Sequence, residues 1–492
     1  MGFLTEGALR RMRFWGNVAL AVLLGLPVAL SLLIAAANCC DETPTPEVIS
    51  ASEFKIDDIP PEKNSYYALV GMIAPAGKDP HAWGREIVRS ANEYHALPEH
   101  LRDEEGPRYM EMINHPRRFR YRNPFPPVET SRTRNGGDKP VAHNRSKQRK
   151  DFCPENAVRC LPEYARQAAL IDKAMAENRE LIARYRSQYR YPHFREMIIP
   201  ELSSPLPRYA HLPHDLVRAV IGREAVRGND AGVVRALAED TRYWRLVLRE
   251  GRHLLSKMIA AKYISDNARL ASEIISSRPL TRPDLDTLGG TFAPLDADEL
   301  SLQSALHAEF ASARRLFSTL LPRFGTTECW ERFARCMSSK LVYQPDATVN
   351  LMYMHYKTGI AATRLPGPEY TSYMENRPPR GEFSLWRWHL VYNPAGKYMM
   401  HVGRPLFEGY SGRLRNLDGL LRLVQLRIDI RIAALPDSKI EALLAASRHK
   451  DPYTNKPMKW DARTRSIYFM GMRRSDLETP PLLSERFEIR LN

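Results

Sequence analysis

The chain has 492 residues and a formal net charge of +15, with 72 lysine and arginine residues against 57 aspartate and glutamate residues. This length exceeds one typical domain of about 150 residues and leaves room for a sizeable core. The positive charge suits anionic partners such as nucleic acid, lipid headgroups or acidic polymers. The six cysteines include no pair with the short C-x2-4-C spacing, which argues against a structural zinc site.

A long apolar stretch near the N-terminus determines where the rest of the chain is expected. Residues 14–37 carry no charged side chain, and about 20 apolar residues suffice for a helix to cross a bilayer. Arg10, Arg11 and Arg13 precede the stretch, and acidic residues follow it. The positive-inside rule therefore predicts a single-pass signal anchor, with residues 1–13 cytoplasmic and the rest of the chain outside.

Two alternatives for this segment stay open. A signal peptide could be cleaved after the small residues Ala35–Ala37, although its apolar region is usually only about 7–15 residues long. Cys39 or Cys40 could carry a lipid, but neither follows the small residue expected just before a lipoprotein cysteine. We expect an uncleaved transmembrane helix.

Composition and periodicity divide the remaining chain into segments. Within the first part of the folded body, residues 64–80 predict an apolar strand or turn-rich piece, and residues 81–96 predict a helix. The expected order is a Pro/acid-rich spacer (38–65), an N-terminal segment of the body (66–114), a basic loop or disordered insertion (115–152), a helical domain (153–365) and an α+β C-terminal domain (366–492).

The basic insertion is the clearest candidate for contact with an anionic surface. It places aromatic residues among four arginines, Arg117, Arg118, Arg120 and Arg122. Such a pattern suits single-stranded nucleic acid in a cytoplasmic protein. Outside the cytoplasm it would meet anionic lipid or a cell-wall polymer instead, and a merely solvated loop is the alternative. No nucleic acid is expected as a partner.

Helical periodicity dominates residues 161–362. One helix is predicted over 163–190 and another from Asp215 onward. Apolar stripes over 254–275 and 302–320 predict two helices that pack on each other as a hairpin. Asp296 and Glu299 have the spacing of a capping box.

The C-terminal part has a mixed pattern. Residues 383–392 are aromatic and β-prone, and residues 412–436 form an amphipathic helical pattern. Two short strands are predicted in 451–471 around a turn at 461–466, and the alternation in 486–491 predicts a third strand. The expected fold is mainly α, with an N-terminal transmembrane helix, a helical-hairpin body and a small α+β C-terminal unit with short antiparallel strands.

Four cysteines are candidates for disulfides: Cys153, Cys160, Cys329 and Cys336. The turn-prone stretch between the first two could bring their Cα atoms within the roughly 4.4–6.8 Å that a disulfide needs. The stretch between the last two predicts a helix, which would hold them roughly 10 Å apart. The pairing of the six cysteines stays open.

His211, His214 and Asp215 come closest to a metal cluster. Pro213 interrupts the helical spacing of the two histidines, and no third ligand is evident. We therefore expect Asp215 to cap a helix and the histidines to be exposed. No metal or other cofactor is predicted.

Two charged residues fall on the apolar sides of the predicted helical pair. Lys257 lies between Leu254 and Met258, and Glu309 lies between Leu306 and Phe310. Because a lone buried charge is costly, we predict an interhelical ion pair between Lys257 and Glu309. The alternative is a catalytic carboxylate with a raised pKa in a cleft.

Several segments in a shared order resemble a family of membrane-anchored proteobacterial proteins that has no assigned activity. The segments are YYALVGMIAPAGKDPHAWG (66–84), FCPENAVRCLPEYARQ (152–167), SKMIAAKYI (256–264), SALHAEF (304–310), YQPDATVN (343–350), YNPAGKYMM (392–400) and DPYTNKPMKW (451–460). The resemblance covers most of residues 64–471. It implies a Gram-negative envelope, with the anchor in the inner membrane and the body in the periplasm.

The sequence thus predicts a non-enzymatic accessory or scaffold protein of the bacterial envelope with envelope proteins as partners. A periplasmic hydrolase or ligand-binding protein, with a site assembled from dispersed residues, is the alternative. An enzyme should show a deep polar pocket with converging acids and histidines, whereas a scaffold should show an apolar or basic exposed patch.

Overall fold

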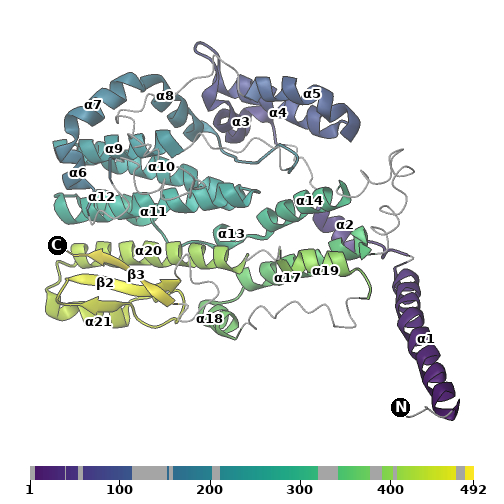
Figure 1. Ribbon diagram of the computed structural model, residues 1–492. Coiled ribbons are helices and arrows are strands. Elements are labelled where there is room, and N and C mark those ends of the chain that lie inside the picture. Colours follow the sequence, from purple (N-terminus) through teal and green to yellow (C-terminus); the bar gives the residue numbers. More distant parts are fainter. Residues whose placement is uncertain are drawn as a thin grey trace, which may run out of the picture. The chain divides into compact units, whose positions relative to one another are not determined.

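The computed structural model describes residues 6–38, 40–53, 59–113, 152–153, 159–201, 211–319, 342–376, 391–402, 407–472 and 483–491. The chain is mainly helical and has a small antiparallel sheet near its C-terminus (Figure 1), as predicted. It divides into two compact units. Unit 1 comprises residues 1–53, 310–358 and 378–405, and unit 2 comprises residues 54–309, 359–377 and 406–492.

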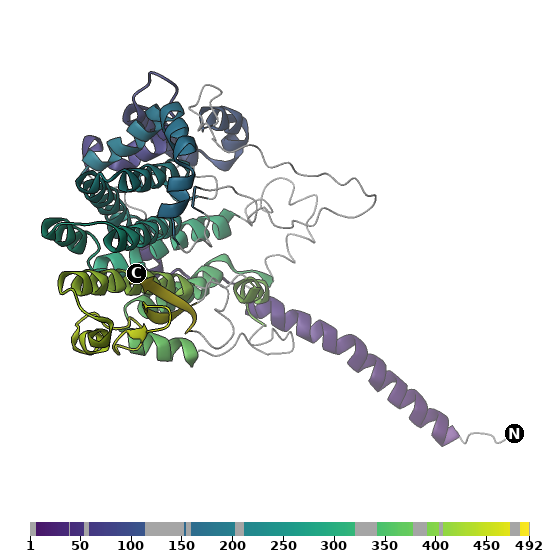
Figure 2. The ribbon, with the colours of Figure 1, turned by 90° about the vertical axis from the view of Figure 1, so that its left-hand side faces the viewer.

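Unit 1 begins with the predicted apolar helix. Its helices are α1 (Glu6–Ala37), α2 (Pro46–Ser52), α19 (Pro394–Val402), most of α17 (Pro345–Thr363) and the second half of α14 (Gln303–Thr319). Figures 1 and 2 show α1 as one continuous helix. Within the described residues, Phe14–Ala37 is the one stretch long and apolar enough to cross a membrane, and none of its described side chains is buried.

The segment after α1 is folded where a spacer was predicted. The Thr45 side chain accepts the N–H of Val48 and caps α2. The carboxylate of Asp41 accepts the N–H groups of Asp346 and Ala347, at 2.8 and 3.0 Å, in the first turn of α17. The spacer prediction is therefore wrong for this part. Prolines and acidic residues also begin and cap helices, and here they do so.

Unit 2 starts with short helices where a strand was considered. Asn64 caps α3 (Ser65–Val70) by accepting the N–H of Tyr66, and η2 (Gly71–Ile73) follows directly. Both pack on α4 (Pro80–Ala96), which confirms the predicted helix at 81–96. The strand prediction is wrong. The apolar side chains of α3 and η2 are all buried, and a continuously apolar run fits a buried strand and a buried helix equally well.

The helices between residues 161 and 190 are shorter than the single helix that was predicted there. The stretch predicted as one helix over 163–190 breaks at Gln167 and Asn178. The helices are α5 (Glu99–Ile113), α6 (Leu161–Arg166), α7 (Ala168–Glu177), α8 (Arg179–Ser187) and η4 (Gln188–Arg190), and η1 (Pro61–Lys63) precedes α3.

A helical hairpin forms the centre of unit 2, but its partners differ from the predicted pair. The helices here are α9 (His211–Arg227), α10 (Asp230–Glu250), α11 (Leu254–Ser277), α12 (Arg282–Thr291) and α13 (Ala297–Leu300). Figure 1 shows α11 between α10 and α20 (Glu408–Ile432), and these are the two helices on which α11 mainly packs. The predicted pairing of the 254–275 and 302–320 stripes is thus wrong, because other apolar faces cover α11.

The C-terminal elements match the prediction closely. Strands β1 (Lys459–Asp461), β2 (Ser466–Met472) and β3 (Leu483–Arg490) form an antiparallel sheet in the order β1-β2-β3. The sheet packs on α20, where a Cβ at Gly419 would lie 2.4 Å from the ring of Phe469. Only glycine lets the strand approach the helix this closely. The helices α18 (Gly367–Glu375), η8 (Asp437–Lys439) and α21 (Ile440–Ala446) complete unit 2.

The predicted boundary between a helical domain and a C-terminal domain at residue 365 is not found. Helix α20 packs along α11 on one side and against β2 and β3 on the other. The sheet and the helical hairpin therefore share one core within unit 2.

Candidate functional site

A cluster of polar side chains lies buried where four helices of unit 2 meet. Asp240 of α10 is at its centre and is 1% exposed, and His214 of α9 is 0% exposed. Tyr185 of α8 and Asn267 of α11 reach the same point, and Tyr189 of η4 approaches from its side. The cluster joins all of these elements through one carboxylate.

Hydrogen bonds from three side chains fill both oxygens of Asp240. Tyr185 and Tyr189 donate to Oδ1 at 2.7 and 2.6 Å, and Asn267 donates to Oδ2 at 2.6 Å. Burial raises the pKa of Asp240, and these donors oppose the shift. Burial and the nearby Asp240 charge raise the pKa values of both tyrosines. The carboxylate is thus held by neutral donors that keep their protons.

His214 completes the cluster. Its Nδ1 lies 3.0 Å from the Tyr185 hydroxyl and 3.5 Å from Oδ2 of Asp240. Its ring stacks on Tyr263, with centroids 3.7 Å apart. A Tyr–His–Asp group of this kind could move a proton, but a substrate would have to reach it. Because Asp240 and His214 are both buried among the helices, we assign the cluster to packing rather than catalysis.

The histidine prediction needs correction here. His211, Pro213, His214 and Asp215 all lie in α9, which starts at His211 rather than at Asp215. Pro213 falls in the first turn, where a proline is tolerated because its missing N–H has no helical partner. His214 is consequently buried and not exposed. Among the described residues, no three His, Cys, Asp or Glu side chains are grouped to hold a metal ion.

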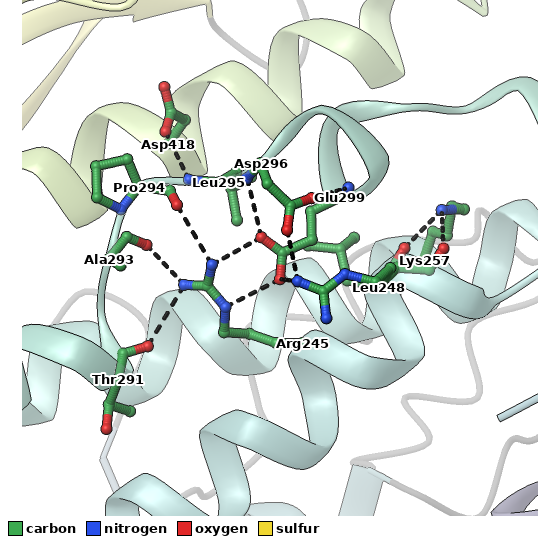
Figure 3. A network of polar contacts seen from close by, with 11 residues as sticks. Arg245, Leu248, Lys257, Thr291, Ala293, Pro294, Leu295, Asp296, Glu299 and Asp418 are labelled. Atoms are coloured by element: carbon green, nitrogen blue, oxygen red, sulfur yellow. Dashed lines mark hydrogen bonds and ion pairs between the residues drawn. The ribbon is translucent and has the colours of Figure 1, made fainter. Parts of the chain in front are cut away.

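A second polar network, centred on Arg245 and Glu299, fixes a loop in unit 2 (Figure 3). Arg245 of α10 makes a bidentate pair with Glu299, at 2.9 and 2.7 Å, and Glu299 is fully buried. The same guanidinium donates to the carbonyl oxygen of Ala293 at 2.6 Å. Glu299 also closes the predicted capping box with Asp296, which is confirmed.

Helix α20 holds this loop from the other side. Asp418 accepts the N–H of Leu295 at 2.9 Å (Figure 3). Gln425 donates to the carbonyl oxygens of Gly289 and Phe292, both at 2.8 Å. The connection between α12 and α13 thus clamps α10 to α20 through polar contacts that are satisfied on both sides.

Lys257 and Glu309 do not form the predicted ion pair, because each has a helix end as its nearer partner. Lys257 donates to the carbonyl oxygen of Leu248 at 2.5 Å, in the last turn of α10 (Figure 3). Burial lowers its pKa to about 8, and the charge of Glu196 opposes this shift. Burial raises the pKa of Glu309, while His253 and the N–H of Leu254 at the start of α11 lower it. Helix ends attract opposite charges, which accounts for both placements.

A surface pocket of about 490 Å³ lies between the helices of unit 2 and strand β3. Residues of α6, α9, α11 and β3 line it, and its walls are mostly apolar. The lining contains no histidine, and its charged residues are four arginines and two glutamates: Arg159, Arg269, Arg278, Arg490, Glu273 and Glu488. The pocket therefore has the apolar and basic character expected of a binding surface.

The predicted Cys153–Cys160 disulfide borders this pocket. The two Cα atoms are 5.3 Å apart and the sulfurs are bonded, so this prediction is confirmed. Glu273 of α11 accepts the N–H groups of Cys160 and Leu161, at 2.8 and 2.9 Å. Disulfide and carboxylate together fix the start of α6 on α11. The motif FCPENAVRC could have indicated this wall, but the sequence did not reveal its partners on α11 and β3.

Other predicted site residues lie outside the described residues. These are Cys329 and Cys336, the four arginines of the basic insertion, Arg117, Arg118, Arg120 and Arg122, and the β-prone stretch at 383–390.

We predict that Asp240→Asn lowers the free energy of unfolding by about 3 kcal/mol, because an amide nitrogen would face donors in the buried cluster. Asp286→Asn is the control, since Asp286 forms an exposed pair with Arg282 and should change stability by less than about 1 kcal/mol. Thermal and urea unfolding of the full chain in detergent measure both effects. Equal stability of the two variants would contradict the structural role of Asp240.

Lys257 makes stability depend on pH. Its pKa of about 8 in the folded chain is below the ordinary value of about 10.4 for an unfolded lysine. Between these two values the unfolded chain binds more protons, so stability rises with pH across this window. Relative to Lys257→Met, the wild type should gain roughly 3 kcal/mol from pH 7.5 to pH 10.5.

Urea unfolding at a series of pH values measures this gain. Lys262→Met is the matched control, because Lys262 is an exposed lysine of the same helix that pairs with Asp266. A flat difference between the wild type and Lys257→Met across this range would show that Lys257 keeps an ordinary pKa.

Comparisons of the chain with family models, with curated proteins and with solved structures give no match. The resemblance to membrane-anchored proteobacterial proteins stays a prediction.

Proposed function

We propose that this chain is a single-pass protein of a bacterial inner membrane whose periplasmic body acts as a non-enzymatic accessory or scaffold for envelope proteins. The exposed apolar side chains of α1 support the anchor. The Cys153–Cys160 disulfide supports an oxidising compartment for the body, because disulfides persist mainly outside the cytoplasm.

The coupling between α1 and the rest of unit 1 carries the scaffold proposal. Asn38, directly after α1, donates to the carbonyl oxygen of Val391 at 2.7 Å and accepts the N–H of Asn393 at 2.8 Å. Gln344 donates to the Asn38 carbonyl oxygen at 2.8 Å. These bonds hold the end of the anchor against the rest of unit 1. A flexible linker would not fix its position. A fixed position beside the membrane suits a scaffold.

Helix α17 strengthens this connection further along the chain. Asn350 donates to Glu42 and to the carbonyl oxygen of Thr43, at 2.9 and 3.2 Å, and accepts the N–H of Thr45. Together with the Asp41 cap, these contacts make residues 38–47 part of unit 1.

The alternative, a ligand-binding protein or hydrolase, is favoured by one observation, the pocket beside the disulfide. Its apolar and arginine-rich lining suits binding more than hydrolysis. The acid and histidine closest to a catalytic arrangement, Asp240 and His214, are buried elsewhere in the same unit. We therefore place binding, rather than catalysis, second.

The topology is testable with fusions after Asn492. Alkaline phosphatase, which is active only in the periplasm, should be active there, and a green fluorescent protein that folds only in the cytoplasm should stay dark. Changing Arg10, Arg11 and Arg13 to glutamate should lower the phosphatase activity several-fold, because the positive-inside bias is lost. A bright fluorescent fusion, or a body released into the soluble fraction, would refute the anchored topology.

The scaffold role is testable by crosslinking in cells, purification from membranes and mass spectrometry. The wild type should bring down envelope proteins in stoichiometric amounts. The double variant Asn38→Ala and Asp41→Ala should lose most of these crosslinks while staying in the membrane, because the anchor is no longer held on unit 1. Glu47→Gln is the control, since it removes only an exposed pair with Lys357.

A preparation of this chain alone from wild-type cells would refute the scaffold role. So would unchanged crosslinks in the double variant, because the rigid connection would then have no bearing on partners.

A further inference from the structure

The pocket beside the disulfide has apolar walls and several charged side chains, of which only some are already paired within the chain. Leu161 and Pro162 of α6, Val226 of α9 and Ile489 of β3 contribute apolar walls. Val226 is 38% exposed and, with Pro162, is the most open of these apolar positions. A side chain of this kind gains from contact with an apolar ligand.

Both carboxylates of the lining are already engaged. Glu273 accepts two backbone N–H groups at the start of α6. Glu488 pairs with Arg486 at 2.6 Å and with Arg490 at 3.6 Å. Their negative charge is thus largely compensated before any ligand arrives.

Unlike the two carboxylates, the arginines of the lining are only partly paired. Arg278 makes a bidentate pair with Asp230, at 2.7 and 3.2 Å. Arg159 and Arg269 are exposed, and neither forms an ion pair with a carboxylate among the described residues. The pocket therefore presents two cations that can pair with an anion from solution, next to an apolar wall.

We propose that this pocket binds an anionic amphiphile, a molecule with one acyl chain and a carboxylate or phosphate headgroup. The acyl chain lies along Val226, Leu161 and Ile489, and the headgroup pairs with Arg159 and Arg269. The volume of about 490 Å³ falls within the range of about 300–1,000 Å³ for small-molecule sites. The inference goes beyond the scaffold role and does not depend on it.

Guanidinium groups suit both headgroups, because their planar N–H pairs match carboxylate and phosphate oxygens. A small anion alone would leave the exposed Val226 uncovered. A neutral amphiphile would not pair with the two arginines. A ligand with both features uses both the apolar and the charged parts of the lining.

The test is photolabelling of the full chain in phosphatidylcholine nanodiscs with a dodecanoate that carries a diazirine on its acyl chain. Mass spectrometry should place the label on peptides around Leu161, Val226 and Ile489, besides the apolar α1. Labelling of α1 serves as the internal reference. Unlabelled dodecanoate and dodecyl phosphate should compete at the pocket, and the stronger competitor identifies the headgroup.

Two variants and a control distinguish binding at this site from nonspecific labelling. Arg269→Gln should lower pocket labelling relative to α1 by about tenfold, the size of one charge-assisted hydrogen bond. Val226→Trp should block it by filling the pocket. Arg235→Gln, an exposed arginine of α10 away from the pocket, should leave it unchanged. Thermal unfolding verifies that each variant is folded.

Three results would overturn the proposal. Pocket labelling that does not fall below the wild-type level in Arg269→Gln would remove the role of the arginine. Competition by inorganic phosphate would reduce the pocket to a plain anion site. Competition by dodecyl maltoside as strong as that by dodecanoate would show that the headgroup charge is irrelevant.

Discussion

The cost of burying charge on α10 governs the arrangement of unit 2. Asp240 and Arg245 both lie on this helix, and a buried charge without partners would destabilise the fold by several kcal/mol. Asp240 therefore gathers donors from α8, η4 and α11, while Arg245 takes Glu299 and the carbonyl oxygens of the α12–α13 connection. These partners hold α10 against α11 through Asn267, and the α12–α13 connection holds α10 against α20. Polar satisfaction and core packing thus specify the same structure.

The sequence predicted elements well and partners poorly, for a physical reason. Periodicity reports which face of a helix is buried, so α4, α20 and the β1-β2-β3 sheet were predictable. It does not report what covers that face, so α11 was paired with the wrong helix. Asp240 could have been noticed, because Val233, Leu237, Trp244 and Val247 place it on an apolar stripe. Its partners could not, since they come from three other elements distant in sequence.

Helix ends explain why three charged side chains have partners other than the predicted ones. The sequence predicts that Lys257 and Glu309 pair with each other, and it places Asp41 in a spacer. Each instead meets the free carbonyl or N–H groups at a helix terminus. Every helix offers several such groups, and they carry a partial charge. In a chain built from many short helices, the termini are additional partners for charged side chains, so predicting side-chain pairs alone overlooks them.

The same principle separates the two places where chemistry could occur. In the Asp240 cluster every strong donor is directed at one carboxylate, so binding a substrate there would break bonds that hold four elements together. In the pocket beside the disulfide, Glu273 binds the start of helix α6 and Glu488 pairs with neighbouring arginines. Arg159 and Arg269 remain at the surface, beside the exposed Val226. Groups left available after folding are the ones a ligand can use. Arg159, Arg269 and Val226 are such groups, whereas Asp240 and His214 are buried within their own hydrogen-bonded cluster.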